Sequence, residues 1–459
     1  MLSEGTIVAL STAVGSGAIG VIRVSGPLAI ETTARLFSPC TDKVLQQQKS
    51  HTIHLGDIKD GNQVIDEVLV SLFKNPHSYT GEDVVEISCH GSRYIQEKIL
   101  QLFIQEGIRP AQAGEFTLRA FMNGKMDLSQ AEAVADVIAS ENEASHQVAM
   151  QQMRGGVSQE IKQLRQELLD FASLIELELD FAEEDVDFAD REAFEALLEK
   201  ISRLLKKLID SFALGNSIKK GIPIAIIGPP NAGKSTLLNA LLEEDKAIIS
   251  AIAGTTRDSI EDEITINGIG FRFIDTAGIR DTQDEIEQIG IQKTFQKAEQ
   301  AAIVLYLIDS QHYFDENPQQ LEQLNQLREN FPEKPVWVIW NKTDLIDNQL
   351  PEKLAGYPTL QMSAKTAKGL EELKQLLVNY LEQQNYQDQS VISNSRHYSA
   401  LNAALTEIVK VQDGLNNNLS GDLLAIDLRQ ALFHLGEITG EVTNDELLGN
   451  IFANFCIGK

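Results

Sequence analysis

The stretch GPPNAGKST, from Gly228 to Thr236, constrains the fold of this chain more than any other. It fits the pattern G-x-x-x-x-G-K-[ST] and stands between IPIAIIG, a run typical of a buried strand, and a run typical of a helix. In that setting glycines let backbone N–H groups surround phosphates, Lys234 reaches the β- and γ-phosphates, and the Ser235 hydroxyl is offered to Mg²⁺. We therefore predict an α/β domain with a phosphate loop made of Asn231, Ala232, Gly233, Lys234, Ser235 and Thr236.

Two further stretches are typical of segments that approach a γ-phosphate. GTTRD supplies Thr256, whose hydroxyl can join Mg²⁺ when the γ-phosphate is present and leave after hydrolysis. DTAG follows the run GFRFI, which we expect to pair with DEITI through an Asn267-Gly268 hairpin, so that Asp275 stands at a strand end and can hold a metal-bound water. The residues predicted to line this side of the nucleotide are Ser250, Ala251, Ile252, Ala253, Gly254, Thr255, Thr256, Asp275, Thr276, Ala277 and Gly278.

Guanine specificity is predicted by NKTD, which ends the buried run PVWVIW. Its aspartate can accept hydrogen bonds from N1–H and the 2-amino group of guanine, whereas adenine offers neither donor. A buried carboxylate left unpaired costs free energy, so the motif favours GTP over ATP. Ser363-Ala364-Lys365 follows another strand and completes the base pocket, whose predicted residues are Asn341, Lys342, Thr343, Asp344, Ser363, Ala364 and Lys365. Because all these motifs occur in order, we predict a GTP hydrolase.

The residue after DTAG is Ile279, where GTPases of the Ras type have the glutamine that orients the attacking water. Asn231 offers a carboxamide oxygen that could bind a monovalent cation together with carbonyls of Ser250 to Thr255, and such a cation would supply the charge of an arginine finger. The alternative is that Asn231 shapes a tight turn. Glu287 is the candidate for placing the water, and its alternative is an exposed acid at the start of a helix.

Composition excludes several classes of protein. With 459 residues the chain is long enough for roughly three domains. We find no apolar stretch near the length of a membrane span and no signal peptide, and Cys40, Cys89 and Cys456 lack disulfide or zinc spacing, so we expect a cytoplasmic protein without a membrane contact. The net charge of −28 disfavours strong binding to nucleic acid by this chain alone. We interpret the acidic run from Ile175 to Glu199 as a solvated helix face.

Four segments follow from the pattern of apolar residues. Residues 1–118 mix strand-like runs (TIVALS, VIRVS, VIDEVLVSLF, DVVEISC) with helices and predict an α+β domain, with a hairpin turn at Asp60-Gly61. Residues 119–215 and 384–459 are helical, and the apolar stripe that includes Ile161, Leu168 and Ile175 needs a partner to cover it. Residues 216–383 alternate buried strands with helices. We predict that this P-loop α/β domain is inserted into one helical domain, whose halves cover each other's apolar faces.

Several stretches together resemble the MnmE (TrmE) family of tRNA-modification GTPases, namely GPPNAGKST, SAIAGTTRD, DTAGIR followed by DEIEQIGI, NKTD and the terminal FCIGK. The resemblance covers essentially the whole chain, and the terminal CIGK is especially specific. It implies a homodimer and, with an FAD-containing partner that makes most of the tRNA contact, the addition of a carboxymethylaminomethyl or aminomethyl group to carbon 5 of the wobble uridine. The one-carbon unit would come from a tetrahydrofolate. The alternative from another class is a ribosome-assembly GTPase switch without its own chemistry.

The resemblance also assigns roles to residues. It implies that K⁺ is held by Asn231, Ser250, Ile252 and Thr255, and that Glu287 helps orient water beside Lys234 and Asp275. Arg280 would then be dispensable as an arginine finger, and it is kept as the alternative candidate for that role. The family's N-terminal domain forms the constitutive dimer and is similar to folate-dependent carriers. Carried over by motif, the residues that would bind 5-formyltetrahydrofolate are Arg23, Glu86, Lys125 and Lys459.

The residues themselves support the folate site modestly. Two cations suit the carboxylates of a folate tail, and Glu86 can accept hydrogen bonds from pterin amino groups, although scattered surface charges are the alternative. Cys456, close to the end of the chain, is a possible redox or nucleophilic thiol near the folate, and its alternative is a small apolar residue in a packed tail.

Overall fold

The computed structural model describes residues 5–180, 191–248, 262–274, 295–312, 318–346, 350, 353–354, 356–382, 391–417, 419–453 and 455–458. The chain forms two compact units by its internal packing. The first consists of Met1–Ala135, Gln152–Leu197 and Thr406–Lys459, and the second of Asp136–Gln151 and Leu198–Leu405. None of the helices that the structure describes has the length and apolar character needed to cross a membrane.

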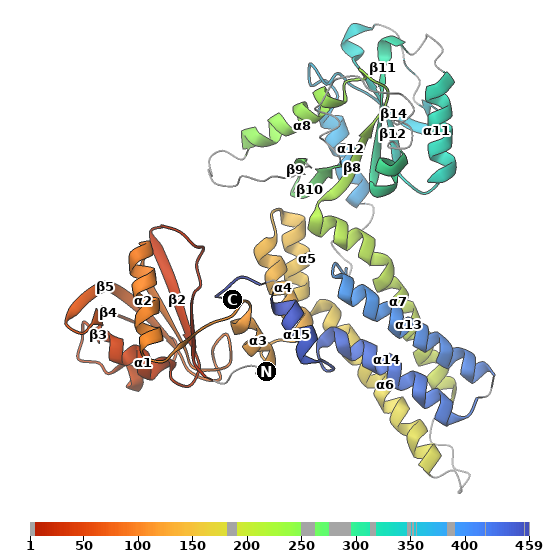
Figure 1. The fold of residues 1–459 in the computed structure, drawn as a ribbon. Helices are drawn as coiled ribbons and strands as arrows, with labels where there is room; N and C mark the ends of the chain where they lie inside the picture. The colour runs from red at the N-terminus through yellow and green to blue at the C-terminus, as the bar shows by residue number, and fades with distance from the viewer. Residues whose placement is uncertain are drawn as a thin grey trace. The chain divides into compact units, whose positions relative to one another are not determined.

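The first unit begins with a seven-stranded sheet (Figure 1), made of β1 Ile7–Leu10, β2 Ile19–Ser25, β3 Phe37–Pro39, β4 Thr52–Asp60, β5 Gln63–Phe73, β6 Val84–His90 and β7 Arg109–Pro110. Their order in space is β3-β4-β5-β6-β2-β1-β7. Alternate residues such as Ile22, Val24 and Val70 are buried in one core with α1 Ala29–Leu36 and α2 Arg93–Gln105. Because side chains alternate along a strand, Arg23 stands on the other face of the sheet. The predicted α+β domain is confirmed.

The hairpin between β4 and β5 lies one residue further along the chain than predicted. Asp60 pairs with Gln63 in the sheet, so the two turn residues are Gly61 and Asn62 rather than Asp60 and Gly61. Gly61 has φ 58°, a backbone conformation that glycine adopts without a steric penalty. The aspartate therefore ends the strand, and the glycine begins the turn.

Helices complete the first unit, and their bounds are α3 Glu115–Met122, α4 Leu128–Ala139 (to residue 135), α6 Gly156–Asp180, α14 Gly421–Thr439 and α15 Asp445–Phe452. The predicted apolar stripe lies on α6, where Ile161, Leu168 and Ile175 are buried. Its partner is α14, which packs along α6 (Figure 1). Burying each such side chain contributes about 2 kcal/mol. The prediction that the two helical halves cover each other is therefore confirmed for this pair of helices.

The second unit contains a second seven-stranded sheet with the helices α5 Glu143–Met153 (to residue 151), α7 Arg191–Lys220 (from residue 198) and α13 Ser395–Asn416 (to residue 405). Its strands are β8 Ile222–Ile227, β9 Asp262–Ile266, β10 Ile269–Phe273, β11 Ile303–Asp309, β12 Val336–Asn341, β13 Lys353–Leu354 and β14 Tyr357–Gln361. They lie in the order β13-β14-β12-β11-β8-β10-β9. The buried strands predicted from IPIAIIG, AAIVLYLID and PVWVIW are confirmed as β8, β11 and β12.

Helices cover both faces of this second sheet (Figure 1). One core joins alternate strand residues such as Ile226 and Leu305 to α8 Lys234–Ile248 and α12 Leu370–Glu382. The other joins the intervening residues, including Tyr306 and Trp340, to α11 Pro318–Asn330. Because the inner strands are buried on both faces, they are continuously apolar, as parallel sheets require. This is the predicted P-loop α/β domain.

Candidate functional site

The phosphate loop connects the end of β8 to the start of α8. Gly228 has φ 143°, and a Cβ added there would stand 2.2 Å from the carbonyl oxygen of Leu307, so only glycine fits. Lys234 is the first residue of α8, and its Nζ donates to the carbonyl oxygens of Gly228 at 2.9 Å and Pro229 at 2.8 Å. The loop therefore curls around the amine that is predicted to meet the phosphates.

The surroundings of Lys234 disfavour an uncompensated positive charge. Burial, and secondarily the positive charge of Lys297, lower the pKa of Lys234 from its ordinary value. A phosphate anion beside the ammonium would act in the opposite direction, since a neighbouring negative charge favours the protonated form. The charged form of the Lys234 amine would therefore be stabilised more by an anion in the loop than by the loop carbonyls alone.

Asn341 joins the predicted phosphate loop to the predicted base pocket. Its Nδ2 donates to the carbonyl oxygen of Ala232 at 2.8 Å, and its Oδ1 accepts from the backbone N–H of Ala364 at 2.9 Å. A Cβ on Gly233 would stand 2.2 Å from that Nδ2, which requires glycine at this position. The buried amide therefore brings the GPPNAGKST, NKTD and Ser363-Ala364-Lys365 stretches together at the carboxyl ends of β8 and β12.

The turn after β12 orients the rest of the base motif. Lys342 adopts φ 63°, and its Nζ donates to Oδ2 of Asp309 at 2.6 Å. The next residues form the short helix η4 Thr343–Leu345, in which Asp344 is exposed and free to face a base. Asp309 was not predicted from the sequence. The strand that it ends was recognised, and a polar residue at the carboxyl end of a buried strand was the available signal.

Part of the predicted nucleotide site lies outside the described residues. These positions are Ser250 to Thr256, Asp275 to Gly278, Arg280 and Glu287. Of the predicted Mg²⁺ ligands the structure describes Ser235, near the start of α8, and of the predicted K⁺ ligands it describes Asn231. Asn231 is exposed in the phosphate loop and has φ 61°, which fits the tight turn that was the alternative reading and leaves its side chain at the surface.

Arg23 and Glu86 form a polar site on the N-terminal sheet. They are directly opposite each other on β2 and β6, and Arg23 Nε donates to Glu86 Oε1 at 2.9 Å. The Arg23 guanidinium also lies over the rings of Tyr79, 5.1 Å from the centroid, and Phe116, 5.6 Å from the centroid. The structure therefore brings together two of the predicted folate residues and adds two aromatic rings that were not predicted.

The C-terminal tail lies against the same site. The carbonyl oxygen of Gly458 accepts from Ser11 Oγ at 3.1 Å and from Arg23 Nη1 at 3.4 Å. The tail is also held by Gly114, whose N–H donates to the carbonyl oxygen of Cys456 at 3.4 Å. The Cys456 side chain is exposed rather than packed in a core. Lys459, which follows Gly458, lies outside the described residues.

Lys125 is held by a different part of the site. Its Nζ donates to the carbonyl oxygen of Pro76 at 3.0 Å, and the neighbouring Asn123 Nδ2 donates to the carbonyl oxygen of Thr80 at 2.7 Å. Both bonds attach the end of α3 to the loop that carries Tyr79. Lys125 is thus connected to the Arg23 site through this loop.

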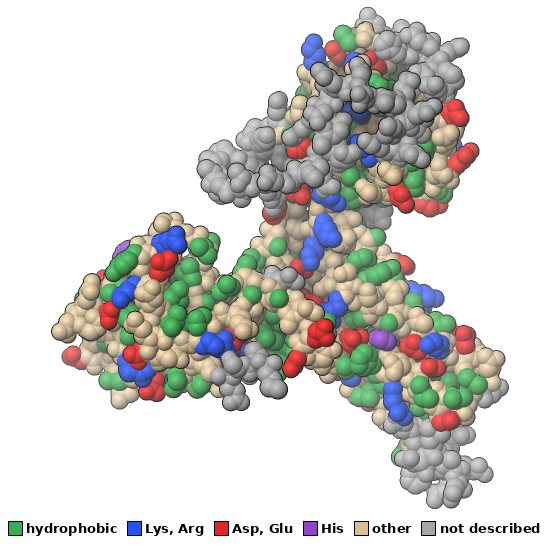
Figure 2. All heavy atoms as spheres, viewed as in Figure 1, with side chains coloured by type: hydrophobic (Ala, Val, Ile, Leu, Met, Phe, Trp, Pro, Cys, Tyr) green, Lys and Arg blue, Asp and Glu red, His purple; other side chains and the backbone are tan. Residues whose placement is uncertain are grey.

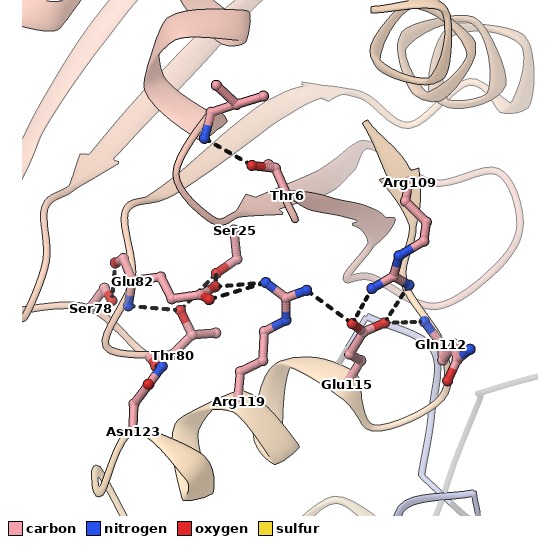
Figure 3. A network of polar contacts seen from close by, with 11 residues as sticks. Thr6, Ser25, Ser78, Thr80, Glu82, Arg109, Gln112, Glu115, Arg119 and Asn123 are labelled. Atoms are coloured by element: carbon pink, nitrogen blue, oxygen red, sulfur yellow. Dashed lines mark hydrogen bonds and ion pairs between the residues drawn. The ribbon is translucent and has the colours of Figure 1, made fainter. Parts of the chain in front are cut away.

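A chain of charged side chains connects Glu82, Arg119, Glu115 and Arg109 (Figure 3). Arg119 Nη1 donates to both carboxylate oxygens of Glu82, at 3.1 and 3.0 Å, and its Nη2 donates to Glu115 Oε1 at 3.1 Å. Arg109 donates to both oxygens of Glu115, at 2.5 and 2.9 Å, and the Gln112 N–H donates to one of them at 2.9 Å. We name Arg109, Glu115, Arg119 and Glu82 the ion network.

The ion network keeps Glu115 ionised although its side chain is only 2% exposed. Burial alone would raise the pKa of this carboxyl, but the hydrogen bonds from Arg109, the Gln112 N–H and Arg119 together outweigh it and lower the pKa below its ordinary value. The network was not predicted, because Glu115 and Arg119 are spaced like an ordinary exposed pair on a helix.

The chain as a whole is similar to proteins of one family. A sequence profile described as the MnmE helical domain matches residues 128–456, and one described as the GTP-binding protein TrmE N-terminus matches residues 6–125. The tRNA modification GTPases MnmE of Christiangramia forsetii and Flavobacterium psychrophilum are 60% and 58% identical to it, each over 100% of both chains. Among solved structures, the FeoB G-domain from Methanococcus jannaschii is 27% identical, covering 35% of this chain and 98% of that chain with a TM-score of 0.26.

Proposed function

Because the chain belongs to the MnmE family of tRNA modification GTPases, we propose that it is a potassium-dependent GTP hydrolase that modifies carbon 5 of the wobble uridine in certain tRNAs. With an FAD-containing partner it adds a carboxymethylaminomethyl or aminomethyl group whose one-carbon unit comes from a tetrahydrofolate. The observation that carries this proposal is the second polar site around Arg23, where the C-terminal tail meets the N-terminal sheet. A GTPase that acts only as a switch has no need of such a site.

At the nucleotide site, this chain's residues bind and orient GTP. Lys234 neutralises the β- and γ-phosphates, Asp344 accepts hydrogen bonds from guanine, and Asn341 keeps both halves of the site in register. Ser235 and Thr256 would hold Mg²⁺, and Asn231 with Ser250, Ile252 and Thr255 would hold K⁺. The exposed carboxamide of Asn231 in the phosphate loop supports that ligand set, since amide and carbonyl oxygens suit a hard cation.

The missing glutamine is compensated by two groups in this proposal. Bound K⁺ would supply the positive charge that an arginine finger gives other GTPases, and Glu287 would help orient the attacking water, while Asp275 would hold a metal-bound water. Ile279 then has no catalytic role, and Arg280 is dispensable.

At the N-terminal site, Arg23 with Lys125 and Lys459 would bind the carboxylates of 5-formyltetrahydrofolate, and Glu86 would accept from its amino groups. The donor set fits such a ligand. A guanidinium has five N–H donors, and the bonds of Arg23 to Glu86 and Gly458 leave some of them for an anion. The exposed Cys456 close by is a possible reactive thiol in this site.

The chain is proposed to work as a homodimer in the cytoplasm, and its flavoprotein partner would make most of the tRNA contact. The net charge of −28 supports this division, because phosphates are repelled by an acidic protein. On the face seen in Figure 2, Lys and Arg side chains lie among Asp and Glu rather than in one continuous patch.

The nucleotide part of the proposal is tested by measuring GTP hydrolysis in potassium and in sodium at equal ionic strength. We expect potassium to raise the rate by at least about tenfold, and Asn231→Ala to abolish the difference. Asn417→Ala is the control, since the Asn417 Nδ2 donates to the carbonyl oxygen of Asp413, at the end of α13. Equal rates in both salts would disprove the potassium dependence.

A further inference from the structure

The ion network connects the segments that surround Arg23. Glu82 follows the loop that carries Tyr79, and Glu115 and Arg119 lie on α3 on either side of Phe116. Glu82 Oε2 also accepts from Ser25 Oγ at 2.7 Å, and Ser25 belongs to the same strand as Arg23 (Figure 3). The loop, the helix and the strand are therefore joined through Arg119.

These connections fix the two rings that lie over Arg23. Tyr79 stands between Ser78, whose Oγ donates to the Glu82 carbonyl oxygen at 2.6 Å, and Thr80, whose Oγ1 lies 2.7 Å from Ser25 Oγ. The Tyr79 hydroxyl lies 2.8 Å from Thr117 Oγ1 on α3. A shift of either the loop or the helix would therefore move a ring against the Arg23 guanidinium.

Because the ion network is buried, its charged groups must keep their hydrogen-bond partners. The Arg119 side chain is 7% exposed and that of Glu115 is 2% exposed, so each charge depends on its partner for solvation. Apolar residues of similar volume would often stabilise a fold as well as a buried ion pair does. What the charged groups add is a defined direction for each bond, because the planar guanidinium of Arg119 faces Glu82 on one side and Glu115 on the other.

We propose that Arg119 is a positioning residue for the tetrahydrofolate site, an inference that rests on the proposed function of Arg23. Arg119 holds the loop and α3 so that Tyr79 and Phe116 keep the Arg23 guanidinium in one orientation toward a folate carboxylate. It does not touch the ligand itself. Through α3 it also supports Gly114, which holds the C-terminal tail.

The test is the dissociation constant of 5-formyltetrahydrofolate for the full-length protein, measured by calorimetry beside the melting temperature. We expect Arg119→Met to weaken binding by about tenfold or more, because outer residues that orient a ligand-binding group have effects of this size. The affinity of Arg119→Lys should lie between those of the wild type and Arg119→Met. Lysine keeps the positive charge, but its ammonium lacks the planar fork that reaches both carboxylates.

Two comparisons separate positioning from a general loss of stability. Arg165→Met is the matched control, because Arg165 forms an ion pair with Glu441 in the same unit without contacting the site. It is expected to lower the melting temperature and leave folate affinity unchanged. In a double-mutant cycle, adding Arg119→Lys to Tyr79→Leu should weaken binding less than Arg119→Lys does alone, since the ring to be positioned is gone.

Glu82→Gln provides a milder variant if Arg119→Met fails to fold, and it is expected to weaken folate binding as Arg119→Lys does. Wild-type affinity in both Arg119→Lys and Glu82→Gln would overturn the inference while the proposed function stands. Additive effects in the double-mutant cycle would also overturn it. A wild-type protein that binds no folate would instead disprove the proposed function, and the inference with it.

Discussion

Glu115 illustrates how a buried charge at the N-terminal site depends on its hydrogen-bond partners. Its carboxylate accepts hydrogen bonds from Arg109, Arg119 and the Gln112 N–H, and it is thereby kept ionised inside the protein. Buried charges are tolerated when every lone pair finds a donor. The same bonds make the local stability of α3 dependent on pH.

The pKa of Glu115 is lower in the folded protein than its ordinary value of 4.5. The unfolded segment therefore binds the proton more readily, so this contribution to stability is complete above about pH 4.5 and is lost as the pH falls through the folded-state pKa. We expect the opening free energy of α3 to fall on acidification in the wild type, and to be smaller and nearly constant in Glu115→Gln. Hydrogen exchange of the peptide containing Glu115–Met122, followed by mass spectrometry, measures it.

Glu97→Gln is the control for this experiment, because Glu97 pairs with Arg93 on the exposed surface of α2. It should keep the wild-type pH dependence of α3. An unchanged pH dependence in Glu115→Gln would contradict the assignment of the effect to Glu115.

At the scale of elements, the β9–β10 hairpin of the second sheet contacts helix α5. The Ala144 N–H, in the first turn of α5, donates to the carbonyl oxygen of Gly268 at 2.9 Å. The two turn residues, Asn267 and Gly268, have φ 48° and 77°. This is the type of turn that matches the twist of a hairpin, as the sequence predicted from Asn-Gly.

Gly268→Ala should destabilise this hairpin more than the same change does at a hairpin turn that has no close neighbour. A Cβ at Gly268 would stand 2.8 Å from Glu143 Oε2 and 2.9 Å from Glu143 Cβ, in addition to the strain of a positive φ. We expect the opening free energy of β9–β10 to fall by about 2 to 3 kcal/mol, the sum of backbone strain and overpacking. Hydrogen exchange of the peptide containing Ile264 to Phe273 measures this change.

Gly61→Ala is a matched control for that variant. Gly61 also has a positive φ in a two-residue hairpin turn, but a Cβ there would meet nothing within 4 Å. The expected loss for the β4–β5 hairpin is therefore about 1 kcal/mol, from backbone strain alone. Equal losses of opening free energy in Gly268→Ala and Gly61→Ala would show that the contact with Glu143 does not contribute to the destabilisation.

The elements that could be predicted from the sequence were those whose signal is local. β8, β11 and β12 are continuous apolar runs, and α6 carries its apolar stripe at helical spacing, so one segment is enough to recognise each. The phosphate loop and the base motif are likewise short contiguous stretches, and the structure brings them together through Asn341.

The ion network and the aromatic rings over Arg23 carry no such local signal. Arg119 and Glu82 are separated by 37 residues, and a charged residue on a helix is exposed far more often than buried. The hairpin at Gly61 was placed one residue early because the aspartate before a glycine fits a turn as well as a strand end. Such details depend on tertiary partners rather than on the segment.

At the scale of the whole molecule, the N-terminal site is built from both ends of the chain. Ser11 and Gly458 are joined by a hydrogen bond although 447 positions separate them in the sequence. Closing so long a loop costs conformational entropy, which the packing of the intervening segments must offset. The proposed folate site is therefore complete only in the full-length fold.

Gly458→Ala should remove the tail from this site without shortening the chain. Gly458 has φ 97°, and a Cβ there would stand 2.2 Å from the carbonyl oxygen of Leu10, a backbone atom that cannot move aside easily. The bonds from Ser11 and Arg23 to Gly458 would then break. We expect the affinity for 5-formyltetrahydrofolate to fall by about tenfold or more, since the tail carries Lys459 and Cys456, which are proposed for this site.

Gly449→Ala is the control for the tail, because a Cβ at this position in α15 meets nothing within 4 Å and its backbone is helical. It should bind folate as the wild type does. The dissociation constant of GDP serves as an internal reference for Gly458→Ala, because the nucleotide loop belongs to the other compact unit. Undiminished folate affinity in Gly458→Ala would mean that the tail lies against the Arg23 site without taking part in it, and that Arg23 and Glu86 bind the ligand with the sheet and the Tyr79 loop alone.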